Sequence, residues 1–437
     1  MKVGFVSLGC SKNLIDTEMA IGLFKNNGFE IVNEVEKAEL IIINTCGFIE
    51  SAKQEAINTI LEMAEYKESG VCKYLVVMGC LVQRYSKELK KAIPEVDLFI
   101  TIDEYDEFWE KILELLNKSN NNFSKLCYMD RVISTGNKTA YLKIAEGCSN
   151  KCTYCAIPYI RGPYVSRPME DILEEAKALS QKEIEELIVI AQDTTRYGED
   201  LYGEAKLSNL LNELCKIEGF KWIRFLYAYP ESITDELIET VKSNNKICNY
   251  FDIPIQHISD KVLKRMNRRT TGKQIEELIN KIKTKIPDAI LRTSLIVGFP
   301  GETKEDFDKL YEFVKKGYFD KLGVFMYSKE DGTPAARLKE QIHPSTKKKR
   351  YNEIMRIEKE KSKQNLEKLV CKTFEVLIEG KTFDDKFYIG RSYMDIPDTD
   401  GMVIIKNTRD NLIGKFVNCK IIEVKDYDLI GEIVTNK

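Results

Sequence analysis

The sequence predicts an α/β protein in three parts: a doubly wound parallel α/β domain, a partial (β/α)6 barrel and a small β-barrel. Residues 1–112 alternate short apolar runs with helical stretches, and residues 138–368 repeat that alternation over six strand candidates. From residue 369 to 437 the hydrophobic period falls toward two. The 437 residues are too many for one compact core, which favours separate domains.

The first domain contains three apolar runs that are typical of strands buried on both faces of a parallel sheet: KVGFVSL, ELIIINT and KYLVVMG. Amphipathic helices are predicted between them, at IDTEMAIGLFKNN and SAKQEAINTILEMAEYK. The next stretch, 113–137, is rich in asparagine and serine around residues 117–124, which predicts a linker or an exposed loop.

The central part contains six strand candidates: AYLKIAEG, ELIVIAQD, WIRFLYAY, YFDIPIQH, LRTSLIVG and KLGVFMYS. A helix-like segment follows each of them but the last, and this repetition favours a partial barrel over an open sheet. Residues 344–368 predict a charged, solvent-bathed helix whose lysines form a solvated face.

The C-terminal part, 369–437, predicts a small five-stranded barrel from four alternating segments: FEVLIEG, KFYIG, GMVIIK and KIIEVKDYDLIGEIV. Residues 371–437 carry ten Lys or Arg and twelve Asp or Glu, a net charge of −2. A module that grips RNA is more often basic. This surface therefore suits a basic protein better, through complementary charge.

The composition limits the site chemistry. The start of the chain lacks the pattern of a signal peptide, and no run of about 18 apolar residues occurs, so we expect a cytoplasmic protein without a membrane partner. In a reducing compartment, the twelve cysteines are more often metal ligands or catalytic groups than disulfides. With only two histidines in the chain, thiolates must supply most ligands, which favours iron–sulfur chemistry.

The first cysteine motif is Cys-x3-Cys-x2-Cys, formed by Cys148, Cys152 and Cys155 after the strand YLKIAEG. Open sites of α/β barrels lie at that end of the strands. Three thiolates can hold three irons of a 4Fe–4S cluster and leave the fourth iron open to S-adenosylmethionine (SAM). Transfer of an electron into the sulfonium of SAM then yields a 5′-deoxyadenosyl radical. The alternatives are incidental buried cysteines or a zinc knuckle, but zinc requires a fourth ligand and neither histidine is near in sequence.

A second cysteine site is predicted from Cys10, Cys46 and Cys80, which are 36 and 34 residues apart but each directly follow an apolar strand. The carboxyl ends of parallel strands share one edge of a sheet, where such sheets bind ligands, so the thiols converge if the three strands are neighbours. Glycines beside each cysteine allow tight backbone near an inorganic group: Gly9, Gly47 and Gly79. The alternative is that these are merely small buried residues. We expect the remaining cysteines to be small buried residues of this kind: Cys72, Cys127, Cys215, Cys248, Cys371 and Cys419.

The chain resembles the methylthiotransferase family of radical SAM enzymes from end to end, through these stretches: SLGCSKNLIDTE, INTCGFIESAKQE, GCSNKCTYCAIPYIRGPYVSR, PIQHISDKVLKRMNR and FMYSKEDGTPA. That family combines an N-terminal three-cysteine domain, a radical SAM barrel and a C-terminal β module called TRAM. Within it, AQDTTRYG and YDLIGE resemble the branch that methylthiolates the β-carbon of an aspartate in the small-subunit ribosomal protein S twelve.

The resemblance implies SAM and two 4Fe–4S clusters as cofactors. The radical-generating cluster would be held by Cys148, Cys152 and Cys155. The auxiliary cluster, whose open iron binds the transferred sulfur, would be held by Cys10, Cys46 and Cys80. One SAM would methylate that sulfur, and a second would yield the radical that abstracts hydrogen from the substrate carbon. Residues expected to contact the cluster or SAM are Tyr154, Gln192, Asp193, Gly298 and Glu302.

Other interpretations stay open at this point. The implied partners are ribosomal protein S twelve or the small ribosomal subunit, with a flavodoxin or ferredoxin as electron donor. The rivals are methylthiolation of a tRNA adenosine, a radical enzyme with one working cluster, and a non-catalytic RNA- or ribosome-binding protein with a zinc knuckle. Gln192–Asp193 can equally cap a helix, and Gly298 can simply form a turn. Arg161 and Arg167 either bind an anionic group or form structural salt bridges.

Overall fold

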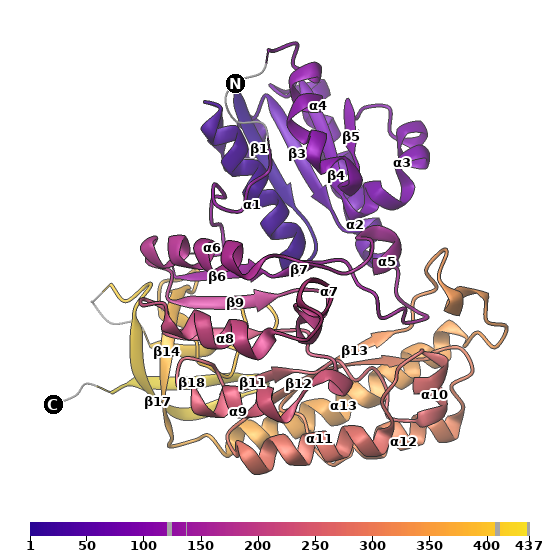
Figure 1. Ribbon diagram of the computed structural model, residues 1–437, viewed down its shortest axis with the longest axis vertical. Helices are drawn as coiled ribbons and strands as arrows, with labels where there is room; N and C mark the ends of the chain where they lie inside the picture. The colour runs from indigo at the N-terminus through magenta and orange to yellow at the C-terminus, as the bar shows by residue number, and fades with distance from the viewer. Residues whose placement is uncertain (120–124, 137, 407–410, 435–437) are drawn as a thin grey trace.

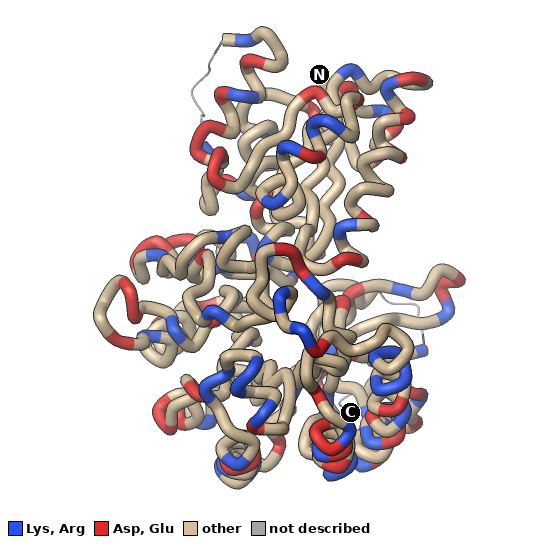
Figure 2. The backbone as a smooth tube through the Cα atoms, turned by 90° about the vertical axis from the view of Figure 1, so that its right-hand side faces the viewer, with Lys and Arg blue, Asp and Glu red and all other residues tan. Residues whose placement is uncertain are grey.

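The computed structural model describes residues 1–119, 125–136, 138–406 and 411–434. In Figure 1 the N-terminal α/β domain lies above the central strands and helices, and the C-terminal barrel lies beside the central strands. Basic and acidic positions alternate along the backbone in Figure 2, in keeping with the net charge of −3. Among the described residues, none of the helices has both the length and the apolar character needed to cross a membrane.

The N-terminal sheet has five parallel strands in the order β2-β1-β3-β4-β5. They are β1 (Lys2–Ser7), β2 (Glu30–Val32), β3 (Leu40–Thr45), β4 (Tyr74–Gly79) and β5 (Leu98–Ile100). Four helices cover the sheet: α1 (Ser11–Asn26), α2 (Glu50–Ser69), α3 (Cys80–Ala92) and α4 (Phe108–Leu115). α1 and α4 pack on one face through Phe24 and Trp109, and α2 and α3 pack on the other through Ile60 and Leu81. The predicted doubly wound sheet is confirmed, with its switch point between β1 and β3.

The central part contains all six predicted strands in chain order: β6 (Thr139–Lys143), β9 (Glu186–Ile190), β10 (Trp222–Phe225), β11 (Tyr250–Asp252), β12 (Ile290–Val297) and β13 (Lys321–Met326). They form two parallel three-stranded sheets, and a bridge between Ile223 and Ile247 connects the first to the segment before β11. The partial barrel is thereby confirmed. Its outer helices are α6 (Met169–Gln181), α8 (Leu207–Lys216), α9 (Asp235–Ser243), α11 (Gly272–Lys285) and α12 (Lys304–Lys315). Shorter elements lie in the connections: β7 (Ala145–Glu146), α5 (Ile157–Ile160), β8 (Val165–Ser166), α7 (Glu199–Tyr202) and α10 (Asp260–Arg265).

The inner face of the partial barrel is filled by the two flanking parts of the chain. Ile188 and Tyr250 on this face share one apolar cluster with Ile15 and Met19 of α1 and with Ile396 of the C-terminal part. α1 therefore packs on its own sheet on one side and on the barrel on the other, which ties the three parts together.

The C-terminal part is a closed barrel in the order β14-β15-β16-β18-β17, as predicted. Its strands are β14 (Thr373–Lys381), β15 (Phe387–Arg391), β16 (Val403–Lys406), β17 (Phe416–Lys425) and β18 (Asp428–Ile433). Arg391 reaches from this barrel to the fully buried Glu186 of β9, which also accepts a hydrogen bond from Arg224. Removing either partner from such a buried pair would leave an uncompensated charge.

Two expectations about exposed segments were wrong in part. Helix α13 (Pro344–Glu367) has the expected solvated lysine face but is not exposed all round, because it buries Ile354 and Ile357 beside β13 and α12. In the segment 113–137, Arg131 is buried between Glu18 and Glu175. Within that segment, residues 120–124 and 137 lie outside the described residues. The two corrections have different causes: α13 is amphipathic and keeps lysines such as Lys349 exposed on its other face, whereas Arg131 is buried because two carboxylates pair with it.

Candidate active site at two cysteine loops

Cys148, Cys152 and Cys155 lie on one loop after β7, at the C-terminal end of the barrel strands. The end of α10 fastens this loop, because Thr153 donates its backbone N–H to the carbonyl of Met266 at 3.1 Å and its hydroxyl to the preceding carbonyl at 2.8 Å. Burial raises the pKa of Cys148, and the neighbouring Asp193 and Cys152 raise it further. The Cys148 thiol is therefore shielded from water, and a bound metal would favour its thiolate form.

Cys152 has a cationic neighbour that the sequence analysis missed. Arg268 is 6% exposed, and its guanidinium lies 3.9 Å from Cys152 Sγ and 4.2 Å from the ring centroid of Tyr229. The Tyr229 hydroxyl lies 3.8 Å from the same sulfur. Arg268 thus places positive charge beside Cys152, where it would balance the negative charge of a bound cluster. Arg268 closes the signature stretch PIQHISDKVLKRMNR, which was the available signal.

Gln192 and Asp193 lie beside this loop, as expected of residues at the same strand ends. Asp193 accepts a 2.7 Å hydrogen bond from the side chain of Asn150, between two of the cysteines. Its other oxygen accepts from Thr195 N at 3.1 Å and so caps a short 3-10 helix. Gln192 donates to Glu146 at 2.7 Å. Asp193 thus fits both interpretations offered for it, a cap and a neighbour of the cysteine loop.

Tyr154, Gly298 and Glu302 are connected through the turn after β12. Tyr154 packs on a small apolar cluster that includes Phe299. Glu302 accepts hydrogen bonds from the N–H groups of Gly298 and Phe299 at 2.6 and 3.1 Å, and from Arg350 of α13 at 2.8 Å. Burial raises the pKa of Glu302 to about 7, although Arg350 opposes the shift. Both carboxylate oxygens are therefore engaged in holding this turn against α13.

Cys10, Cys46 and Cys80 follow the adjacent strands β1, β3 and β4, so the condition for their convergence is met. The three loops touch. A Cβ on Gly9 would lie 2.8 Å from Cys46 Cβ, and a Cβ on Gly47 would lie 2.9 Å from the carbonyl carbon of Cys80. The glycines are thus required for the close approach of one loop to another.

Asn13 of α1 joins these three loops through a single side chain. Its amide donates to the carbonyls of Leu8 and Thr45, at 3.1 and 2.9 Å, just before Cys10 and Cys46. Its oxygen accepts from the Cys80 thiol at 3.3 Å and from Arg161. Asn13 was part of a quoted signature stretch, but no spacing rule identified its role.

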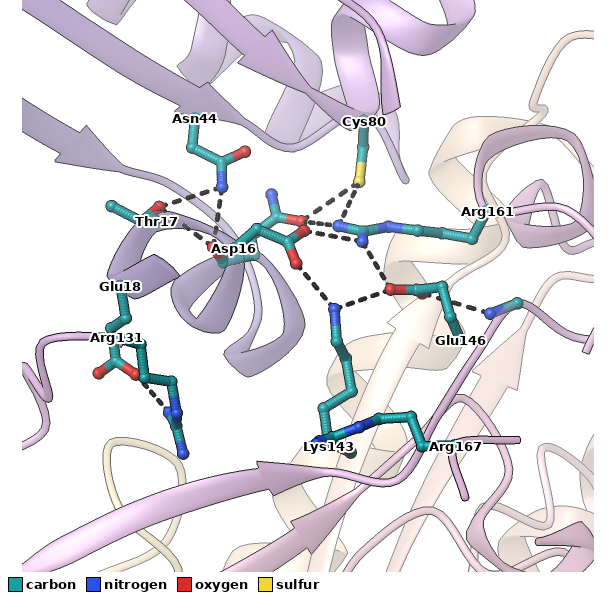
Figure 3. A network of polar contacts seen from close by, with 12 residues as sticks. Asp16, Thr17, Glu18, Asn44, Cys80, Arg131, Lys143, Glu146, Arg161 and Arg167 are labelled. Carbon is teal, nitrogen blue, oxygen red and sulfur yellow. Dashed lines mark hydrogen bonds and ion pairs between the residues drawn. The ribbon is translucent and has the colours of Figure 1, made fainter. Parts of the chain in front are cut away.

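Figure 3 shows Arg161 between Cys80 of the N-terminal site and Glu146, with Asp16 beside it. Its guanidinium lies 2.8 Å from Asp16, 3.1 Å from Glu146 and 3.5 Å from Cys80 Sγ. Lys143 pairs with both carboxylates at 2.8 Å. Burial alone would raise the pKa of Glu146, but Lys143 and Arg161 hold it well below its usual range. The four charges are paired and sum to zero, so the network forms a salt-bridged contact between α1 and the barrel.

The two cysteine sites are linked through the side chains of this network and through apolar packing. Cys80 leads through Arg161 and Glu146 to Gln192, which precedes Asp193 beside the Cys148–Cys155 loop. Cys80 also packs against Ile160 of α5, the short helix that begins two residues after Cys155. Arg167, the other arginine left open, likewise forms a structural pair, with Glu175 at 2.6 Å.

The thiols of the N-terminal set also influence one another. Burial, against the opposing effect of Arg161 and with smaller contributions from Cys10 and Cys46, raises the pKa of Cys80 to about 12. Among the described residues, no three Cys, His, Asp or Glu side chains are arranged to hold a single metal ion. A cubane cluster attaches each thiolate to a different iron, so its ligands need not converge on one point.

The remaining cysteines are free thiols, and they are not uniformly buried. Cys72, Cys248 and Cys419 are buried as expected, Cys127 and Cys215 are half-buried, and Cys371 is exposed. The expectation was therefore wrong for Cys371, which follows the end of α13 and has a positive φ of 70°.

Three family profiles match consecutive parts of the chain. Residues 2–101 match the uncharacterized protein family UPF0004, residues 142–314 the radical SAM superfamily, and residues 370–434 the TRAM domain. The chain also has the fold of TsrM, a radical SAM methyltransferase from Kitasatospora setae, with a TM-score of 0.57 over 76% of each chain at 12% identity. The cobalamin-dependent radical enzyme OxsB has a TM-score of 0.52 over 82% of this chain and 56% of its own, at 13% identity. Fold and cysteine loop together define a radical SAM enzyme.

Full-length relatives narrow that class. The chain is 64% identical over 436 residues to "Ribosomal protein uS12 methylthiotransferase RimO" of Alkaliphilus oremlandii, covering 100% of this chain and 99% of the relative. It is 51% identical to the protein of the same name in Acetivibrio thermocellus, covering 99% and 98%. This chain therefore belongs to the RimO family and is a methylthiotransferase.

Proposed function

We propose that this enzyme replaces one hydrogen on the β-carbon of an aspartate in ribosomal protein uS12 by a methylthio group, using SAM and two 4Fe–4S clusters. The substrate is proposed from the names of relatives that are similar to this protein along the whole chain. The cytoplasm, where ribosomes are found, is the proposed location, and a flavodoxin or ferredoxin is the proposed electron donor.

One observation carries the proposal: two three-cysteine sets from different parts of the chain meet at one junction. Cys80 and the Cys148–Cys155 loop are separated by a single paired network and by helix α5. An aliphatic C–H is neither acidic nor electrophilic, so acid–base and nucleophilic groups cannot cleave it. Placing a radical source next to a sulfur carrier meets that requirement.

The cysteines would hold the clusters, and the other residues would position them. When bound, the clusters and SAM supply the organic radical and the methylated sulfur. Arg268 would balance negative charge at Cys152, and Asn13 would hold the three N-terminal loops in register. Tyr154, Gln192 and Asp193 would line the SAM side of the loop. Gly298 and Glu302 would act by shaping the turn after β12.

The test is mass spectrometry on a strain without this gene, compared with its parent. We expect the aspartate peptide of uS12 to lose the mass of one methylthio group that replaces hydrogen, while digested tRNA nucleosides stay unchanged. Loss of a methylthio-adenosine with uS12 unchanged would instead assign the enzyme to tRNA. No change in either pool would remove both substrates.

A further inference from the structure

Lys12 is a largely buried residue whose amine has no anionic partner among the described residues. Its side chain is attached to the first turn of α1, and the residue is only 6% exposed. In the part of the chain that the structure describes, its amine forms neither an ion pair nor a hydrogen bond, and its one polar contact is the face of the Tyr227 ring, 3.1 Å from the centroid. The amine itself is not among the buried polar atoms that lack a partner, so the end of the side chain stays accessible, and an ammonium with no carboxylate beside it is expected to attract an anion.

The other buried cations of the junction do not share this property. Lys143 and Arg161 pair with Asp16 and Glu146, and Arg131 pairs with Glu18. Lys12 is therefore not one more member of the structural network. A ring face holds an ammonium more weakly than a carboxylate does, so Tyr227 can keep the amine in place until an anion arrives.

Lys12 also lies between the two cysteine sites. It follows Cys10 by two residues and precedes Asn13, which binds Cys80. Tyr227 follows β10, and its carbonyl accepts from the N–H of Thr194, the residue after Asp193, at 3.2 Å. The amine thus reaches from the N-terminal cysteine site to the strand ends that carry the other one.

We infer that the Lys12 amine binds a carboxylate, and that this carboxylate is the side chain of the substrate aspartate. The inference rests on the proposed function. A carboxylate attached to the reacting carbon would be held by up to three N–H donors, which fixes the carbon between the two cysteine sites. The methionine carboxylate of SAM is the other source of this chemistry, and the experiment separates the two.

The experiment uses the full chain with reconstituted clusters and two peptides of the uS12 segment, one with the aspartate and one with asparagine in its place. Peptide binding is measured by fluorescence anisotropy, and methylthio transfer is measured by mass spectrometry. We expect wild type to bind the aspartate peptide about 30-fold more tightly than the asparagine peptide. Lys12→Met should remove that difference. Lys25→Met, a matched change at an exposed position of the same helix, should keep it.

The outcomes are distinct. The inference is overturned if wild type binds the two peptides equally, or if Lys12→Met keeps the preference for the aspartate peptide. In either case, modification of the peptide by wild type would still uphold the proposed function. If Lys12→Met has a raised KM for SAM but keeps its preference for the aspartate peptide, the amine binds SAM, and the inference is again overturned. Absence of binding and of modification in wild type defeats the proposed function and the inference together. If Lys12→Met loses iron, Lys12→Gln is measured in its place. The comparison of the two peptides on wild type tests independently whether the carboxylate is recognised.

Discussion

The two cysteine sites differ in how the sequence builds them. One is contained in the eight residues from Cys148 to Cys155, on a loop that only needs to be fastened to the end of α10. The other collects Cys10, Cys46 and Cys80 from three strand ends, and the side chain of Asn13 joins the three loops. A local motif survives changes elsewhere, whereas a site assembled by topology depends on packing far from its ligands.

The largest expected effect separates the sites outright. Cys148→Ala should remove about four irons per chain and abolish 5′-deoxyadenosine formation, because a 4Fe–4S cluster needs its thiolates. Cys46→Ala should remove a similar amount of iron, abolish methylthio transfer and leave 5′-deoxyadenosine formation intact. Iron analysis and product chromatography measure both, with Cys371→Ala at an exposed thiol as the control. Loss of all iron in Cys46→Ala would contradict two independent clusters.

The next effect concerns the contact that the sites share. Arg161→Met leaves Asp16 and Glu146 with Lys143 as their only buried cation, so we expect the chain to lose about 3–5 kcal/mol of stability. The thermal midpoint of the full chain reports the loss. Lys37→Met, which breaks an exposed pair with Glu34, should leave the midpoint unchanged. An equal midpoint for both variants would mean that the buried network contributes nothing.

A third variant tests whether the N-terminal cysteine site depends on a side chain that joins its loops. Asn13→Ala leaves the carbonyls of Leu8 and Thr45 without their donor, at about 1–3 kcal/mol for each buried group. We expect lower iron content from the N-terminal site only, with 5′-deoxyadenosine formation retained. Asn58→Ala, on the exposed surface of α2, is the control. Iron lost equally from both sites would show that the sites are one cooperative unit.

Sequence reasoning predicted this fold well because burial on both faces leaves continuous apolar runs, as in β3 and β4. It also proposed six ligands, one set by spacing and the other by position after strands, and these stay predictions. It missed Lys12, Asn13 and Asp16 because the polar side of an amphipathic helix normally faces water. In α1 those residues are 6%, 0% and 1% exposed, since a second domain covers them. Tertiary contacts of that kind have no local pattern.

The smallest expected effect comes from the loop after β13, which holds the N-terminal site from outside. Arg84 donates to the Gly47 carbonyl at 2.8 Å, beside Cys46, and lies 2.9 Å from Glu330 on that loop. Lys53 also pairs with Glu330, at 3.2 Å, so part of the contact survives in Arg84→Met. We expect Arg84→Met to speed iron release from the N-terminal site to a chelator by a few-fold, about 1 kcal/mol.

The matched variant Lys53→Met removes the other cation from the same carboxylate without touching the Gly47 carbonyl. If the loop holds the site only through Glu330, the two variants should release iron at equal rates. If the bond to Gly47 matters in its own right, Arg84→Met should release iron faster than Lys53→Met. The double variant should speed release by more than the product of the two single effects, because Glu330 is then buried without either cation. Rates equal to wild type in all three variants would show that the topology of β1, β3 and β4 holds the assembled site without support from the loop.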